Sequence, residues 1–203
     1  MQDYRAPLEP ENFYHLYNHS NGNDVIFKTH ENYMFFMRQY TQRVVPVCDT
    51  FAYCLMPNHF HFLIRVLPEN KLEKYFQQKY ERRYKKAFLN FQTFGKLVSK
   101  EFSNLFSSYT QAFNTQKGRI GSLFNPNFKQ KKIDSEKYLI KTVHYIHNNP
   151  IHHGFVGKIE DWKYSSYLAL ITTKPTLLKR NEVIEWFDDL QNFKFFHKQN
   201  IDV

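Results

Sequence analysis

The stretch CLMPNHFHFLIRV, residues 54–66, places two histidines one residue apart among large apolar side chains. This composition predicts a β-strand from residue 59 onward, and successive side chains of a strand point to opposite faces of a sheet. His59 and His61 therefore share one face, while Phe60 and Phe62 share the other. Neighbouring neutral imidazoles on one face are a natural pair of metal ligands. The alternative is that they form the half-exposed polar face of a sheet.

The sequence on either side of this stretch predicts alternating strands and helices. Apolar residues at three- and four-residue steps indicate helices, and turn-forming residues separate the strands. The expected elements are strand 13–19, helix 29–43, strands 45–56 and 59–67 joined by a turn at Pro57-Asn58, a helix from about 97 to the glycines at 118 and 121, strand 122–133 and helix 135–149.

The order β-α-β-β-α-β, followed by a helix, predicts an α+β fold with an antiparallel, ferredoxin-like sheet and helices packed on one face. Pro126 in the fourth strand implies an edge position or a bulge, because proline cannot donate a ladder hydrogen bond. Pro150 is expected to end the last of these helices. We expect one domain over residues 1–170 and a C-terminal extension at 171–203, which we expect to be helical.

Charge and aromatic content point to a polyanionic partner. The 203 residues include 28 Lys and Arg against 19 Asp and Glu, a net charge of +9, together with 14 Tyr and 21 Phe. Nucleic acid can bind both the cationic and the aromatic side chains, because cations bind its phosphates and aromatic rings stack on its bases. No stretch resembles a signal peptide or a transmembrane span, so we expect a cytoplasmic protein with no membrane partner. Cys48 and Cys54, six residues apart and without a CxxC motif, are expected to be reduced.

Residues 68–93 form a charged, aromatic-rich segment that we interpret as a helical insertion. A run of cations alternates there with tyrosines, and it is either a solvated helix face or a DNA-binding surface. The net charge of the chain favours DNA binding. The candidate DNA-binding residues are Lys79, Arg82, Arg83, Lys85 and Lys86.

The helix at 135–149 carries Tyr138, Thr142, Tyr145 and Asn149 at helical spacing, and these residues share one face. If that face lies over the histidine strand, the Asn149 amide oxygen becomes a third ligand and Tyr145 presents its phenol beside the metal. Two imidazoles, an amide oxygen and phosphate oxygens suit Mg²⁺ or Mn²⁺, with Zn²⁺ as the competitor. From the residues alone, a packed helical tyrosine is the favoured interpretation of Tyr145 over a nucleophile, because most helical tyrosines are packed.

Two motifs resemble a known family. MPNHFHFLIRV, residues 56–66, is similar to the His-hydrophobic-His strand of the HUH transposases that use a single catalytic tyrosine. YIHNNPIHHGFV, residues 145–156, followed by WKYSSY, residues 162–167, resembles the tyrosine-helix region of the REP-associated tyrosine transposases. The resemblance extends from about residue 13 to residue 167.

The resemblance implies a function for each matching residue. His59 and His61 would bind a divalent metal, Asn149 takes the position of a Gln or Asn ligand, and Tyr145 would be the nucleophile. The implied reaction is DNA transposition by cleavage and rejoining of single-stranded or hairpin DNA through a 5′-phosphotyrosine with a free 3′-hydroxyl. Residues 1–170 would be the catalytic domain. Dimers occur among relatives, so a homodimer is one expectation.

Two alternatives compete with this reading. The first is a binding module whose ferredoxin-like sheet presents aromatic residues to single-stranded nucleic acid without cutting it. The second is a structural zinc site, for which a fourth ligand is lacking. Further histidines near Tyr145 are interpreted as phosphate or solvent contacts rather than metal ligands. They are His144, His147, His152 and His153.

Overall fold

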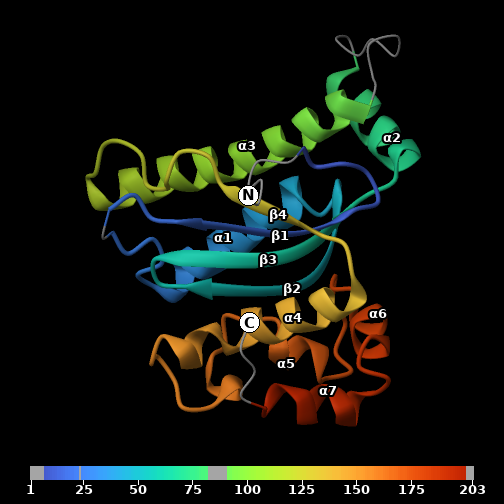
Figure 1. Ribbon diagram of the computed structural model, residues 1–203. Helices are drawn as coiled ribbons and strands as arrows, with labels where there is room; N and C mark the ends of the chain where they lie inside the picture. The colour runs from blue at the N-terminus through green and yellow to red at the C-terminus, as the bar shows by residue number, and fades with distance from the viewer. Residues whose placement is uncertain (1–6, 23, 82–90, 200–203) are drawn as a thin grey trace.

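The structure is a computed structural model that describes residues 7–22, 24–81 and 91–199. Its centre is a four-stranded antiparallel sheet in the order β2-β3-β1-β4, with β3 in the interior and β4 at an edge (Figure 1). The strands are β1 (Phe13–His19), β2 (Cys48–Met56), β3 (His59–Val66) and β4 (Lys129–Ile133). The predicted α+β class and antiparallel sheet are confirmed.

Helices cover both faces of this sheet (Figure 1). On one side lie α1 and α3, and on the other lie α4 and the C-terminal helices. The prediction of helices on one face is therefore wrong, because the chain after β4 folds back over the opposite face. The helices are α1 (His30–Arg43), α2 (Glu69–Tyr80), α3 (Phe91–Lys117), α4 (Glu136–His152), the 3₁₀ turn η2 (Ile159–Asp161), α5 (Tyr167–Leu170), α6 (Arg180–Glu185) and α7 (Leu190–His197).

Successive side chains of β3 point to opposite faces of the sheet, as the sequence predicts. Phe60 and Phe62 are buried against α1, where Phe62 stacks on Tyr40 with ring centroids 4.3 Å apart. His59 and His61 point to the side of α4. Because each buried aromatic side chain contributes about 2–3 kcal/mol, this alternation fixes the register of β3 and so the face on which the histidines stand.

Several element boundaries differ from the predictions, among them the start of α3 at Phe91 and not near residue 97. A turn at 44–47 precedes β2, which starts at Cys48. Residues 122–128, including Pro126, form a loop, and β4 starts only at Lys129, although its predicted edge position is confirmed. Helix α4 continues past Pro150 to His152. A proline removes only one donor in the last turn, so the helix ends three residues later than the predicted end at residue 149.

The predicted insertion begins with α2, whose last turn carries Lys79. The Lys79 ammonium lies 2.5 Å from a carboxylate oxygen of Glu101 on α3, and the Glu101 side chain is fully buried. Lys79 is thus engaged within the fold, which argues against its predicted role as a DNA contact. The other four cations, Arg82, Arg83, Lys85 and Lys86, lie outside the described residues.

The segment after residue 170 contributes α6 and α7, which share an apolar core with α4 and β2. Cys48 and Cys54 are free and buried, as expected. Among the described residues, no helix is both long enough and apolar enough to cross a membrane.

Candidate active site

The histidine face of β3 continues onto β1. In the antiparallel register His19 pairs with His59 and Tyr17 with His61. The His19 and His59 rings stack with centroids 4.7 Å apart, and His15 Nε2 lies 3.0 Å from His61 Nδ1. Sequence reasoning missed the histidines of β1. The signal was present in FYHLYNH, where His15, Tyr17 and His19 alternate along a predicted strand and must share one face.

Helix α4 closes over this face. Asn149 Oδ1 lies 2.9 Å from His59 Nε2. One turn earlier, the half-buried Tyr145 ring sits 5.4 Å from the His61 ring and 5.8 Å from the His15 ring, both edge to face. The structure therefore brings together His59, His61, Asn149 and Tyr145, which the sequence selected from two distant segments.

The donor set fits a cation. His59 Nδ1 lies 2.8 Å from Asn58 Oδ1, and a neutral imidazole has one proton for this oxygen and Asn149 Oδ1; the tautomer protonated at Nδ1 donates to Asn58. The His59 Nε2 lone pair then faces the Asn149 Oδ1 lone pair, two acceptors that a cation between them would satisfy. No three His, Cys, Asp or Glu side chains within the described ranges are arranged to hold a metal ion. A metal bound here would take its other ligands from oxygen atoms, such as those of an amide, water or DNA.

Burial keeps the two imidazoles of β3 neutral. It lowers the pKa of His59 from 6.5 to about 4, and it lowers the pKa of His61 well below 6.5, with nearby histidines acting in the same direction. Neutral rings keep the lone pair that a metal needs. His61 holds its Nδ1 toward His15, so Nε2 is the ring nitrogen that remains to face a metal.

Edge strand β4 places cations beside the site. Lys129 pairs with Tyr17 and Lys131 with His15 in the sheet register. The Lys131 ammonium lies 4.5 Å from the centre of the Tyr138 ring. After burial, Lys131 is the next cause of the lowered pKa of His15, which falls to about 3. The site thus combines neutral imidazoles, a phenol and two ammonium groups, a set suited to a phosphodiester.

Two other histidines of α4 have structural roles. His147 is fully buried, with Nδ1 2.9 Å from His197 Nε2 and Nε2 2.7 Å from Ser166 Oγ. His144 Nε2 lies 3.0 Å from the carbonyl oxygen of Gln199. These contacts join α4 to α7, so the prediction of phosphate or solvent contacts is wrong for His144 and His147.

The histidines after Pro150 differ from those two. His153 is exposed, and its ring lies 5.0 Å from the His59 ring at the margin of the site. His152 is exposed as well and lines a separate cavity of about 540 Å³ between the end of α4 and α7. Only His153 is therefore placed to reach a ligand bound at His59.

Comparison with known proteins supports the resemblance seen in the motifs. No family model matches the chain. Over 119 residues, 59% of its length, the chain is 33% identical to a Haemophilus influenzae protein named a putative REP-associated tyrosine transposase, of which the match spans 58%. The fold is similar, with a TM-score of 0.53 and 18% identity, to the structure of a REP-associated tyrosine transposase bound to a REP hairpin, covering 86% of this chain and 89% of that one. The resemblance and the fold class are thereby confirmed.

Proposed function

We propose that this chain is a REP-associated tyrosine transposase of the HUH type, a metal-dependent enzyme that cleaves and rejoins single-stranded DNA. The observation that carries the proposal is the convergence of His59, His61 and Asn149 with Tyr145 at one place on the sheet. The named relative and the hairpin-bound structural neighbour support the same class of reaction.

The metal would be Mg²⁺ or Mn²⁺, held by His59 Nε2, His61 and the Asn149 amide oxygen. When bound, such an ion draws electron density from the phosphate and stabilises charge in the transition state. The side chains of His59 and His61 are buried beneath α4, and each contacts a neighbouring side chain. Burial and these contacts would keep both ligands neutral and oriented before DNA binds. Lys129 and Lys131 would hold the phosphates of the strand on the side of β4.

Tyr145 would attack the scissile phosphorus in line. Its phenolic oxygen forms a bond to phosphorus while the bond between phosphorus and the 3′-oxygen breaks. The phenol loses one proton, and the leaving 3′-oxygen gains one to become the 3′-hydroxyl. The products are a 5′-phosphotyrosine and a free 3′-hydroxyl. The ester preserves the energy of the broken bond, so a later 3′-hydroxyl can rejoin the strand.

The substrate would be unpaired DNA or the unpaired part of a hairpin, because the scissile phosphate must reach residues that are buried between β3 and α4. The alternative of an aromatic sheet surface that only binds nucleic acid loses support, since helices cover both faces of the sheet in the described chain (Figure 1). A homodimer stays a prediction, which light scattering coupled to gel filtration would test.

A strand-cleavage assay tests this proposal. The protein is incubated with Mn²⁺ and labelled single-stranded hairpins taken from the DNA flanking its own gene. Tyr145→Phe removes one oxygen and should abolish cleavage, whereas Tyr138→Phe, two turns earlier on the same helix face, should cleave at close to the wild-type rate. Equal cleavage by Tyr145→Phe and wild type would contradict the assignment.

The metal ligands are tested by calorimetric titration with Mn²⁺. His59→Ala and His61→Ala each remove one nitrogen donor and should lower the affinity for Mn²⁺ by at least about tenfold, the cost of disturbing a ligand. His30→Ala, an exposed histidine on α1, is the matched control and should bind as wild type does. Unchanged Mn²⁺ affinity in the double variant of His59 and His61 would remove their metal role.

A further inference from the structure

A second cleft lies on the other side of the sheet from Tyr145, between α3 and the loop that leads into β4. Its volume is about 510 Å³, within the range of small-ligand sites. Its floor includes the largely buried rings of Phe106 and Phe124. Pro126 and Phe128 also line it, and hydroxyl and amide side chains supply the rest, among them Asn18, Ser103, Ser107, Gln111, Asn125 and Asn127. An aromatic floor with amide and hydroxyl walls is the chemistry that binds a nucleobase.

The segment that supplies most of this cleft's lining contains no acidic residue, and the neighbouring Asp24 carboxylate is paired with Arg119. Between Phe102 and Ile133 the sequence contains no Asp or Glu, whereas it contains Lys117, Arg119, Lys129, Lys131 and Lys132. The nearest preceding acid, Glu101, is buried against Lys79. A polyanion can therefore approach α3 and the following loop without repulsion from this segment.

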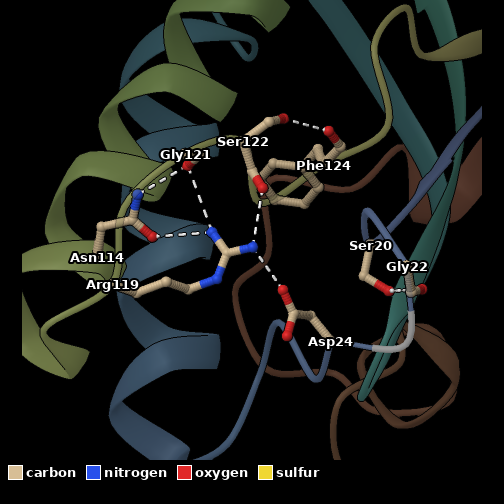
Figure 2. A network of polar contacts seen from close by, with 8 residues as sticks. All are labelled: Ser20, Gly22, Asp24, Asn114, Arg119, Gly121, Ser122 and Phe124. Atoms are coloured by element: carbon tan, nitrogen blue, oxygen red, sulfur yellow. Dashed lines mark hydrogen bonds and ion pairs between the residues drawn. The ribbon is translucent and has the colours of Figure 1, made fainter.

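The loop that forms one wall is held by hydrogen bonds to β1 and α3 and by Arg119, which makes several of its contacts (Figure 2). The Arg119 guanidinium donates to the Asp24 carboxylate at 2.5 Å, to the Ser122 carbonyl at 2.9 Å and to the Asn114 side-chain oxygen at 3.2 Å. Ser122 Oγ in turn donates to the Phe124 carbonyl at 2.6 Å. The wall is thus fixed before any ligand binds, which lowers the entropic cost of binding.

The cleft and the active site are connected around the edge of the sheet. Asn18 lines the cleft, and its neighbours on β1, Tyr17 and His19, face the active site. Phe128, the last loop residue before β4, lines the cleft, and the next residue, Lys129, pairs with Tyr17. A DNA strand that leaves the cleft would therefore cross Lys129 on its way to Tyr145.

We propose that this cleft receives one unpaired nucleotide of the DNA substrate and reads its base. The base would lie over the aromatic floor with its edge toward the Gln111 and Asn125 amides, and the adjoining phosphates would run along the lysines of β4. This inference rests on the proposed function, and it assigns the choice of DNA sequence to a site separate from the one that cuts.

The test measures base preference without cleavage. In a Tyr145→Phe background, the protein selects from a library of single-stranded hairpins randomised in their unpaired segments, and the bound DNA is sequenced. The same selection is run with the exposed Gln111 and Asn125 both changed to Ala, and with Thr115→Ala, an exposed α3 residue outside the cleft lining, as the control. Circular dichroism establishes that each variant folds.

We expect the parent and the Thr115→Ala control to select one base at one unpaired position. The double variant should lose that preference and bind the selected hairpin about tenfold more weakly, as loss of a base contact predicts. An unchanged preference and affinity in the double variant would overturn the inference and leave the proposed function standing. Failure of every protein to bind any hairpin would overturn the proposed function, and this inference with it.

Discussion

Acid should unfold this protein in a narrow pH range, because five histidines are buried and burial holds the pKa of four of them far below 6.5. His59, His61, His147 and His197 are each less than 5% exposed. Burial lowers the pKa of His197 from 6.5 to about 3 and that of His59 to about 4, and it lowers the other two well below 6.5. In the unfolded chain all four bind protons near pH 6.5, whereas the folded protein does not. Their stabilising contribution is complete above pH 6.5 and falls as the pH drops toward the folded pKa.

A pH of 5.5 lies one unit below the pKa of these histidines in the unfolded chain. Keeping each of them unprotonated then lowers the free energy of unfolding by about 1.4 kcal/mol, and the four together lower it by about 5 kcal/mol. That is a large part of the 5–15 kcal/mol that stabilises a typical domain, so urea unfolding followed by circular dichroism should show a steep loss of stability from pH 7 to pH 5.5. His197→Asn should reduce this loss by about a quarter. A change below about 1 kcal/mol over this range in wild type would refute the reasoning.

Three further outcomes follow from contacts in the structure. Lys79→Met leaves the Glu101 carboxylate buried without its partner and should lower the free energy of unfolding by about 2–3 kcal/mol. Adding Glu101→Gln in the same chain should largely restore this stability. No loss of stability in the single variant would show that the pair is not stabilising. Arg119→Ala should destabilise by about 1–2 kcal/mol and speed hydrogen exchange at 119–124, whereas unchanged exchange would show that the loop is fixed by other contacts. Mn²⁺ at 100 times its dissociation constant should stabilise the wild type against thermal unfolding by about 2.7 kcal/mol, and it should stabilise the His61→Ala variant by much less. Equal stabilisation of both proteins would show that the metal binds elsewhere.

The sequence predicted the arrangement around β3 well because alternation in a strand and spacing in a helix are local rules. His59 and His61 had to share a face, and Tyr145 and Asn149 had to lie one turn apart. What joined the two segments was the resemblance to a family. Periodicity gives no distance between a strand and a helix 80 residues away.

Tertiary packing decided the features that the sequence did not show. A helix of mixed polarity such as α4 does not reveal that α7 will cover His144 and His147 and bury both. The charge pattern of α2 could not show that Lys79 faces a buried carboxylate on another helix, because that pairing depends on how α2 packs against α3. The cleft beside α3 was missed for the same reason, since its walls come from three segments that only the fold brings together.

The most direct test of the central claim is the mass of the covalent intermediate. Wild-type protein is incubated with Mn²⁺ and a cleavable hairpin, denatured, digested with nuclease and protease, and analysed by mass spectrometry. If Tyr145 is the nucleophile, a nucleotide phosphate will be attached to the peptide that contains residue 145, and the Tyr145→Phe protein will yield no such adduct. An adduct mapped to Tyr138 or to any other residue, or one formed equally by Tyr145→Phe, would contradict the assignment.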